Sequence, residues 1–156
     1  MDIRAYRPGD APRLADIFFR SVREAALRDY SPAQVLVWAP TRPDPAQFAA
    51  RAEDGRILLV ATGADGEAVA YADLEATGHI DHVYCHPDAV GAGVASRLVD
   101  RLETEARGLG LSRLFVEASE AARRLFLRKG FTEVERRAFE LQGVAIHNYL
   151  MEKFLT

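Results

Sequence analysis

The segment from His79 to Leu98, HIDHVYCHPDAVGAGVASRL, decides the fold of this chain. It reads as a strand that ends in the turn His86-Pro87-Asp88, followed by glycine-rich backbone that runs directly into a helix. Gly91 and Gly93 remove side chains where the backbone turns, so the amides from Gly91 to Ser96 can point outward together. The partial positive charge of the helix N-terminus adds to these amides. The segment therefore predicts a site for a phosphate or pyrophosphate.

Two other interpretations of the glycines compete with this one. The first is a tight strand-to-helix turn without any ligand. The second is a dinucleotide site of the Rossmann type, which requires G-x-G-x-x-G after the first strand of a repeated βαβ unit. Here Ser96 occupies the third glycine position, and the segment follows antiparallel strands. The sequence therefore favours a phosphate site of another kind over a Rossmann site.

The flanking sequence predicts one mixed α/β domain over residues 1–156. Strands that follow one another through short turns pair antiparallel, whereas the helix Gly91–Arg107 joins two strands that should be parallel. We expect a single, mostly antiparallel sheet with one parallel strand pair and helices on both faces. The expected strands are Ile3–Tyr6, Arg56–Thr62, Glu67–Glu75, Ile80–Cys85, Arg113–Glu117, Phe131–Leu141 and Val144–Phe154. The expected helices are Ala11–Arg28, a short one from Pro32, Pro45–Asp54, Gly91–Arg107 and Ser119–Lys129.

Composition excludes several classes of protein. The net charge is −3, so the basic excess of a nucleic-acid binder is missing. Cys85 is the only cysteine, which rules out an intramolecular disulfide and suits a reducing compartment. Neither a secretory leader nor an apolar run of bilayer length is evident. We expect a soluble cytoplasmic protein that binds neither nucleic acid nor membrane.

Two motifs resemble those of the GNAT superfamily of N-acetyltransferases. The first is Val90-Gly91-Ala92-Gly93-Val94-Ala95, which matches the Q/R-x-x-G-x-G/A motif except that valine replaces Gln or Arg. The second is Ser119–Phe131, which matches N-x-x-A-x-x-x-Y-x-x-x-G-F at Ala122, Gly130 and Phe131. Ser119 there replaces Asn, and Phe126 replaces Tyr. The expected order of elements also resembles that family over nearly the whole chain.

The resemblance implies an acyl-CoA-dependent acyltransferase that uses acetyl-CoA as co-substrate and no metal. The pyrophosphate would bind the backbone of the glycine loop, and the pantetheine arm would lie between the strands Ile80–Cys85 and Arg113–Glu117. Arg97, Arg128 and Lys129 are candidate contacts for the phosphates. The cofactor-binding residues implied are Val83, Tyr84, Cys85, Gly91, Ala92, Gly93, Val94, Ala95, Ser96, Ser119 and Phe126.

The reaction implied is direct attack of an amine on the thioester, which requires a base to remove a proton from the ammonium. Asp81 is the first candidate and Glu75 the second. Strand alternation places His79 and Asp81 on one face, and His82 and Tyr84 on the other.

The leaving thiolate lacks the usual acid of the second motif, because Phe126 has no hydroxyl. Tyr84 or Tyr149 would replace it, or the thiol, with a pKa of about 8.5, leaves without help. Cys85 is interpreted as a buried strand residue and not as a nucleophile.

The acceptor, a small-molecule or peptide amine, is expected between the early helices and the closing hairpin. Four aromatic and histidine side chains are candidates for binding it: Tyr30, Trp38, His79 and His147. Three functions stay open: an active N-acetyltransferase, an acyl-CoA sensor without catalysis, and an O-acyl or longer-chain acyltransferase. The resemblance also makes a homodimer through the closing hairpin possible.

Overall fold

The computed structural model describes all 156 residues and builds them from eight strands and five α-helices. The helices are α1 (Ala11–Arg23), α2 (Pro32–Trp38), α3 (Pro45–Ala52), α4 (Val94–Gly108) and α5 (Glu120–Arg128). The strands are β1 (Asp2–Ala5), β2 (Ile57–Thr62), β3 (Ala68–Leu74), β4 (His79–Ile80), β5 (Val83–Cys85), β6 (Arg113–Ala118), β7 (Thr132–Leu141) and β8 (Val144–Phe154). Most expected elements are present, although the helix predicted for Ala11–Arg28 continues after Arg23 as a short 3-10 helix, Ala25–Arg28.

The strands form two sheets of four, ordered β1-β2-β3-β5 and β4-β6-β8-β7, and not the single sheet expected. The pairing directions agree with the prediction. All neighbours are antiparallel except β4 and β6, which are parallel and joined through α4. The α/β class, with one parallel pair in a mostly antiparallel arrangement, is therefore confirmed.

The boundary between the sheets lies inside the strand predicted as Ile80–Cys85. The structure breaks this strand at Asp81 and His82, so that β4 pairs with β6 while β5 pairs with β3. The side chain of Asp73 on β3 causes the break, because its Oδ1 accepts the backbone N–H groups of Asp81 (3.0 Å) and His82 (2.8 Å). A carboxylate thus satisfies two amides that would otherwise need a strand partner.

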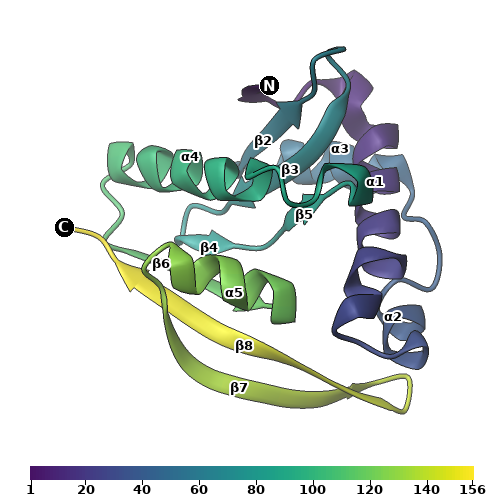
Figure 1. Cartoon of the computed structure of the whole chain (residues 1–156). Coiled ribbons are helices and arrows are strands. Elements are labelled where there is room, and N and C mark those ends of the chain that lie inside the picture. The colour runs from purple at the N-terminus through teal and green to yellow at the C-terminus, as the bar shows by residue number, and fades with distance from the viewer.

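Helices cover both faces of the first sheet (Figure 1). Leu98 and Leu102 of α4 pack on one face in a core that reaches across to Phe126 of α5. Leu14 and Ile17 of α1 pack on the other face together with α3. The hairpin β7–β8 runs below α5 and closes against α2, where Ile146 joins a third, smaller core cluster. No helix combines the length and apolarity that crossing a bilayer requires.

Candidate active site

Two cavities open beside the break between the sheets. The first, called here the loop cavity, has a volume of about 520 Å³ and lies between the 3-10 helix after α1, β5, the glycine loop and α5. The second, called the hairpin cavity, has a volume of about 450 Å³ and lies between β4–β5, β6 and the β7–β8 hairpin. The two cavities share five lining residues: Trp38, Val83, Tyr84, Ser119 and Ala122. The two cavities are therefore adjacent and share a wall.

The glycine loop shapes the end of the loop cavity next to α4. Gly91 (φ 89°) and Gly93 (φ 77°) both adopt the left-handed conformation, and Gly93 is the N-cap of α4. A Cβ atom at either position would meet no protein atom within 4 Å. The loop therefore leaves open space in front of its amides at a helix N-terminus, which is the arrangement that binds phosphate groups.

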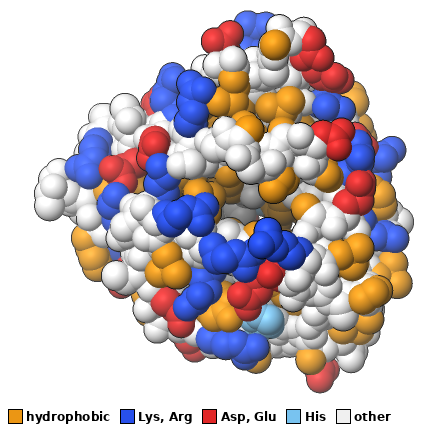
Figure 2. Space-filling view, viewed as in Figure 1, with side chains coloured by type: hydrophobic (Ala, Val, Ile, Leu, Met, Phe, Trp, Pro, Cys, Tyr) orange, Lys and Arg blue, Asp and Glu red, His pale blue; other side chains and the backbone are white.

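Basic side chains border the opening of the loop cavity. Figure 2 shows the hollow near the centre of the viewed face, with Lys and Arg side chains along its lower edge. Arg128 lines the loop cavity and forms no salt bridge, which leaves its charge available to a ligand. Lys129, by contrast, is bound to Asp100 at 2.8 Å.

The structure brings most of the expected cofactor residues together. Phe126 instead lines the hairpin cavity, where it is fully buried against Phe131, and Ala92 lines neither cavity. The expected residues that line the loop cavity are Val83, Tyr84, Cys85, Gly91, Gly93, Val94, Ala95, Ser96 and Ser119.

A chain of three ionisable side chains leads into the hairpin cavity. His79 Nε2 lies 2.5 Å from Glu117 Oε2, and His79 Nδ1 lies 3.3 Å from Glu75 Oε1. Burial lowers the pKa of His79, but the carboxylates of Glu117 and Glu75 outweigh burial and leave the pKa raised. His79 and Glu117 line the cavity, whereas Glu75 does not. The three groups can relay a proton from the cavity outward.

Asp81 lines the same cavity but is held by arginines. Its Oδ2 accepts hydrogen bonds from Arg51 (2.7 Å) and Arg56 (3.3 Å). Burial raises the pKa of Asp81, but the hydrogen bond from Arg51 and the neighbouring positive charges outweigh burial, so the pKa is lowered. A carboxylate with a lowered pKa is a weaker proton acceptor.

The break at Asp81 and His82 lies beside the hairpin cavity, and residues on either side of it line that cavity. Alternation predicted His79 and Asp81 opposite His82 and Tyr84, yet all four line the hairpin cavity. His82 and Tyr84 pack together against Phe18, as alternation places them, whereas His79 stacks on Phe115. Burial and the charge of Arg51 lower the pKa of His82 to about 4, and its Nδ1 lies 2.9 Å from the Tyr71 hydroxyl.

The two candidate acids are in different positions. Tyr84 lies at the junction of both cavities, and burial raises the pKa of its hydroxyl. Tyr149 lines neither cavity, because its hydroxyl donates to Glu120 Oε1 at 2.7 Å. Cys85 lines the loop cavity, and burial raises the pKa of its thiol to about 11, which disfavours the nucleophilic thiolate.

The expected acceptor residues all line the hairpin cavity. Trp38 packs edge-on against Tyr30, with ring centroids 5.4 Å apart. The Tyr30 hydroxyl donates to the backbone oxygen of His147 and accepts the N–H of Glu120, so it ties β8 to the start of α5. His147 Nε2 in turn lies 2.6 Å from Glu120 Oε1.

Three polar residues of this cavity were not among the sequence candidates: Glu117, Arg137 and Asn148. Glu117 is the last residue of the strand predicted before the second motif. Its charge at the end of an apolar strand was the one feature of the sequence that could have marked it as a site residue. Arg137 and Asn148 lie opposite each other on β7 and β8. Nothing in the local sequence distinguishes them from other exposed hairpin residues.

Comparison with known proteins agrees with this geometry. The family model of the acetyltransferase (GNAT) domain matches residues 26–153. An uncharacterised N-acetyltransferase of Escherichia coli (strain K12), YafP, is 30% identical over 151 residues, which is 97% of this chain and 94% of that protein. The chain belongs to the GNAT superfamily of N-acetyltransferases, whose members use acetyl-CoA and an amine acceptor.

Solved structures share the fold. A GCN5-related N-acetyltransferase from Rhodopseudomonas palustris superposes with a TM-score of 0.89 at 38% identity, covering 99% of this chain and 95% of that one. A putative acetyltransferase from Salmonella typhimurium, yncA, solved with its cofactor acetyl-CoA, gives a TM-score of 0.80 at 24% identity. That match covers 100% of this chain and 94% of the other.

Proposed function

We propose that this protein transfers the acetyl group of acetyl-CoA directly to an amine of a small molecule or peptide. The observation that carries the proposal is the meeting of two cavities at Tyr84, one of them ending at an open glycine loop and the other lined by acidic groups. A group-transfer enzyme needs this arrangement, because donor and acceptor must be held with their reacting atoms in contact.

The loop cavity suits coenzyme A. Amides from Gly91 to Ser96 would bind the pyrophosphate, and Arg128 would add a positive charge. β5 is an edge strand of the first sheet, so its outer backbone groups are free to pair with the amide groups of a pantetheine arm. A backbone N–H of β5 would then also stabilise the negative charge that develops on the thioester oxygen.

The hairpin cavity supplies the base. The amine nitrogen must lose a proton as it forms a bond to the thioester carbon and as the carbon–sulfur bond breaks. We propose that Glu117 accepts this proton together with His79, since the two side chains are in hydrogen-bond contact and both face the cavity. Asp81, the first candidate from the sequence, is the alternative general base. Its ion pairs with Arg51 and Arg56 make it a weaker proton acceptor.

Tyr84 is the proposed acid for the leaving sulfur. It lies where the cavities meet, and its raised pKa keeps the hydroxyl protonated at neutral pH. The hydroxyl would give its proton to the thiolate, which leaves free coenzyme A and the N-acetylated product. Phe126 has no proton to give and contributes a buried apolar wall to the hairpin cavity.

Calorimetric titration with acetyl-CoA and free coenzyme A tests the proposal. Wild type should bind both, and Gly93→Glu should abolish binding by placing a carboxylate where the pyrophosphate belongs. Gly110→Glu is the matched control, because Gly110 also has a positive φ (74°) and open space, but ends α4 on the side remote from both cavities. Equal loss in both variants, or no binding by folded wild type, would contradict the proposal. Binding without turnover of any amine would instead support an acyl-CoA sensor.

A further inference from the structure

The charged groups of the hairpin cavity are paired with one exception. Asp81 is bound by Arg51 and Arg56, and Glu117 by His79. Arg137 has no acidic group within 4 Å of its guanidinium and forms no hydrogen bond in the protein. The cavity is therefore lined by one positive charge that is exposed to solvent and has no acidic partner in the protein.

An unsatisfied acceptor lies beside this charge. Asn148 Oδ1 is buried and has no hydrogen-bond partner, and Asn148 lines the same cavity. Buried polar atoms are almost always paired, so an orphan acceptor in a cavity takes its donor from outside the protein, either from water or from the N–H of a ligand that displaces it. Asn148 is the direct cross-strand neighbour of Arg137, and side chains of such a pair emerge on one face with Cβ atoms about 4.5–5.5 Å apart.

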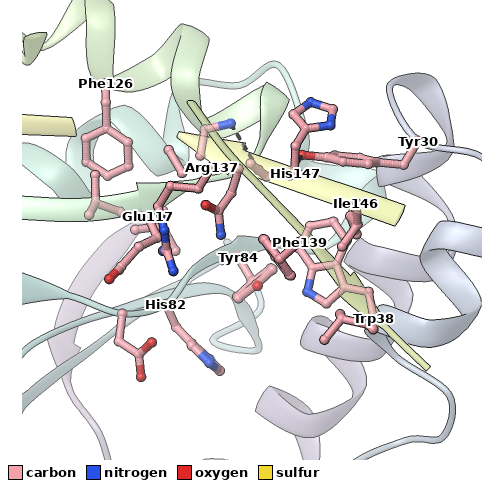
Figure 3. Close-up of a pocket in the computed structure, with 18 of the residues that line it drawn as sticks. Tyr30, Trp38, His82, Tyr84, Glu117, Phe126, Arg137, Phe139, Ile146 and His147 are labelled. Atoms are coloured by element: carbon pink, nitrogen blue, oxygen red, sulfur yellow. Dashed lines mark hydrogen bonds between the residues drawn. The ribbon is translucent and has the colours of Figure 1, made fainter. Parts of the chain in front are cut away.

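The remaining wall is apolar and aromatic. Figure 3 shows Arg137 extending from the hairpin toward the side of the cavity where Glu117 lies, with Trp38 and Tyr84 also facing the cavity. The aromatic side chains that line it are Phe18, Tyr30, Trp38, Tyr84 and Phe139. Such a lining suits a ligand with a polar end and an apolar body.

We propose that the acceptor is a small amine that also carries a carboxylate, as a free α-amino acid with an apolar side chain does. Arg137 binds the carboxylate, and Asn148 Oδ1 accepts an N–H of the amine, which lies within reach of Glu117. The proposal rests on the function proposed above and narrows its substrate. A guanidinium is suited to this task because it binds a carboxylate through two parallel hydrogen bonds.

Matched triplets of amines test this assignment: phenylalanine, phenylalaninamide and phenethylamine, and the corresponding derivatives of leucine. The amide imitates a peptide N-terminus and the amine lacks the carbonyl group entirely. Thiol release with saturating acetyl-CoA gives kcat and KM for each compound. Wild type should prefer the acid over both relatives by about 10- to 100-fold in kcat/KM, the value of one hydrogen bond to a charged group.

Arg137→Gln should raise KM for the acids by a similar factor and leave KM unchanged for the two relatives that lack the carboxylate. Arg136→Gln is the control, since Arg136 is the adjacent residue of β7 and lines neither cavity. It should preserve the wild-type order. Equal kcat/KM across each triplet, preference for the amide or amine, or an equal loss for all three compounds in Arg137→Gln would overturn the proposal.

Binding provides a second readout. Acids titrated into the protein saturated with coenzyme A should bind more weakly to Arg137→Gln than to wild type. If no acid binds or reacts while coenzyme A still binds wild type and not Gly93→Glu, the acceptor class is wrong and the acetyl-CoA site stands. If coenzyme A does not bind, the proposed function itself fails.

Discussion

Asp73 and His82 are joined by two hydrogen bonds of opposite sense. Asp73 Oδ1 accepts the backbone N–H of His82 at 2.8 Å, and the backbone N–H of Asp73 donates to the His82 oxygen at 3.1 Å. The Asp73 side chain is completely buried, and its other oxygen accepts from Arg51 and Arg56. One carboxylate therefore fixes the point at which the two sheets separate and binds the arginines that also hold Asp81.

Removal of the Asp73 carboxylate should destabilise the folded protein. Asp73→Ala is expected to lower the free energy of unfolding by about 3–5 kcal/mol, because two guanidinium groups and two backbone amides lose their partner. Glu67→Ala is the control, since Glu67 is exposed and lies 3.7 Å from Arg13, and should cost less than about 1 kcal/mol. Urea unfolding measures both values. A cost for Asp73→Ala as small as that of Glu67→Ala would show that the carboxylate does not hold the break.

The two candidate bases can be separated by isosteric variants. Glu117→Gln should lower kcat by about 10²–10⁴-fold, which is the range for a lost general base. Asp81→Asn should lower it less, because the Asp81 carboxylate is already bound by Arg51 and Arg56. Steady-state thiol release with unchanged acetyl-CoA affinity is the measurement. A larger loss of kcat in Asp81→Asn than in Glu117→Gln would identify Asp81 as the general base.

The pH dependence of kcat should follow His79. Below its pKa, His79 is protonated and paired with Glu117, so neither group can accept the proton of the amine. Because the pKa of His79 is raised above 6.5, kcat should rise with pH with a midpoint above that value. Glu117→Gln removes the negative charge and should move the midpoint to lower pH. An unchanged midpoint in Glu117→Gln would show that the titration of His79 does not control kcat.

The residue that protonates the leaving thiolate can be identified by replacing two tyrosines separately. Tyr84→Phe should lower kcat by about 10- to 100-fold, at the lower end for general acids because a thiolate is a tolerable leaving group. Tyr149→Phe should leave kcat unchanged, since that hydroxyl binds Glu120 outside both cavities. If both variants retain full kcat, the thiolate leaves without a dedicated acid.

Local patterns were sufficient for much of the fold. Ser31 and Ser119 cap α2 and α5 through their own side chains, and the hairpin turns at Gln142-Gly143, where both residues have positive φ. The glycine loop was found in the same way, because Gly91 and Gly93 report a backbone requirement that is local. These features depend on a few consecutive residues and not on distant partners.

The polar side of the hairpin cavity depends on distant partners. The break at Asp81 requires a carboxylate eight residues earlier in the chain, on another strand. Arg137 faces the cavity only after a bulge, since the pairing of β7 with β8 shifts between Glu133 and Glu135. One extra residue reverses the faces of all that follow, and periodicity alone does not reveal it.

Trp38 is the only tryptophan of the chain, and it stands in the wall between the two cavities. The protein thus carries a single indole fluorophore, which can be excited separately from its tyrosines, at the place where both ligands are proposed to bind. Coenzyme A and the acceptor should each change its emission, so one unlabelled sample suffices to time their arrival. Stopped-flow traces taken with either ligand added first would then establish whether the enzyme imposes an order of binding.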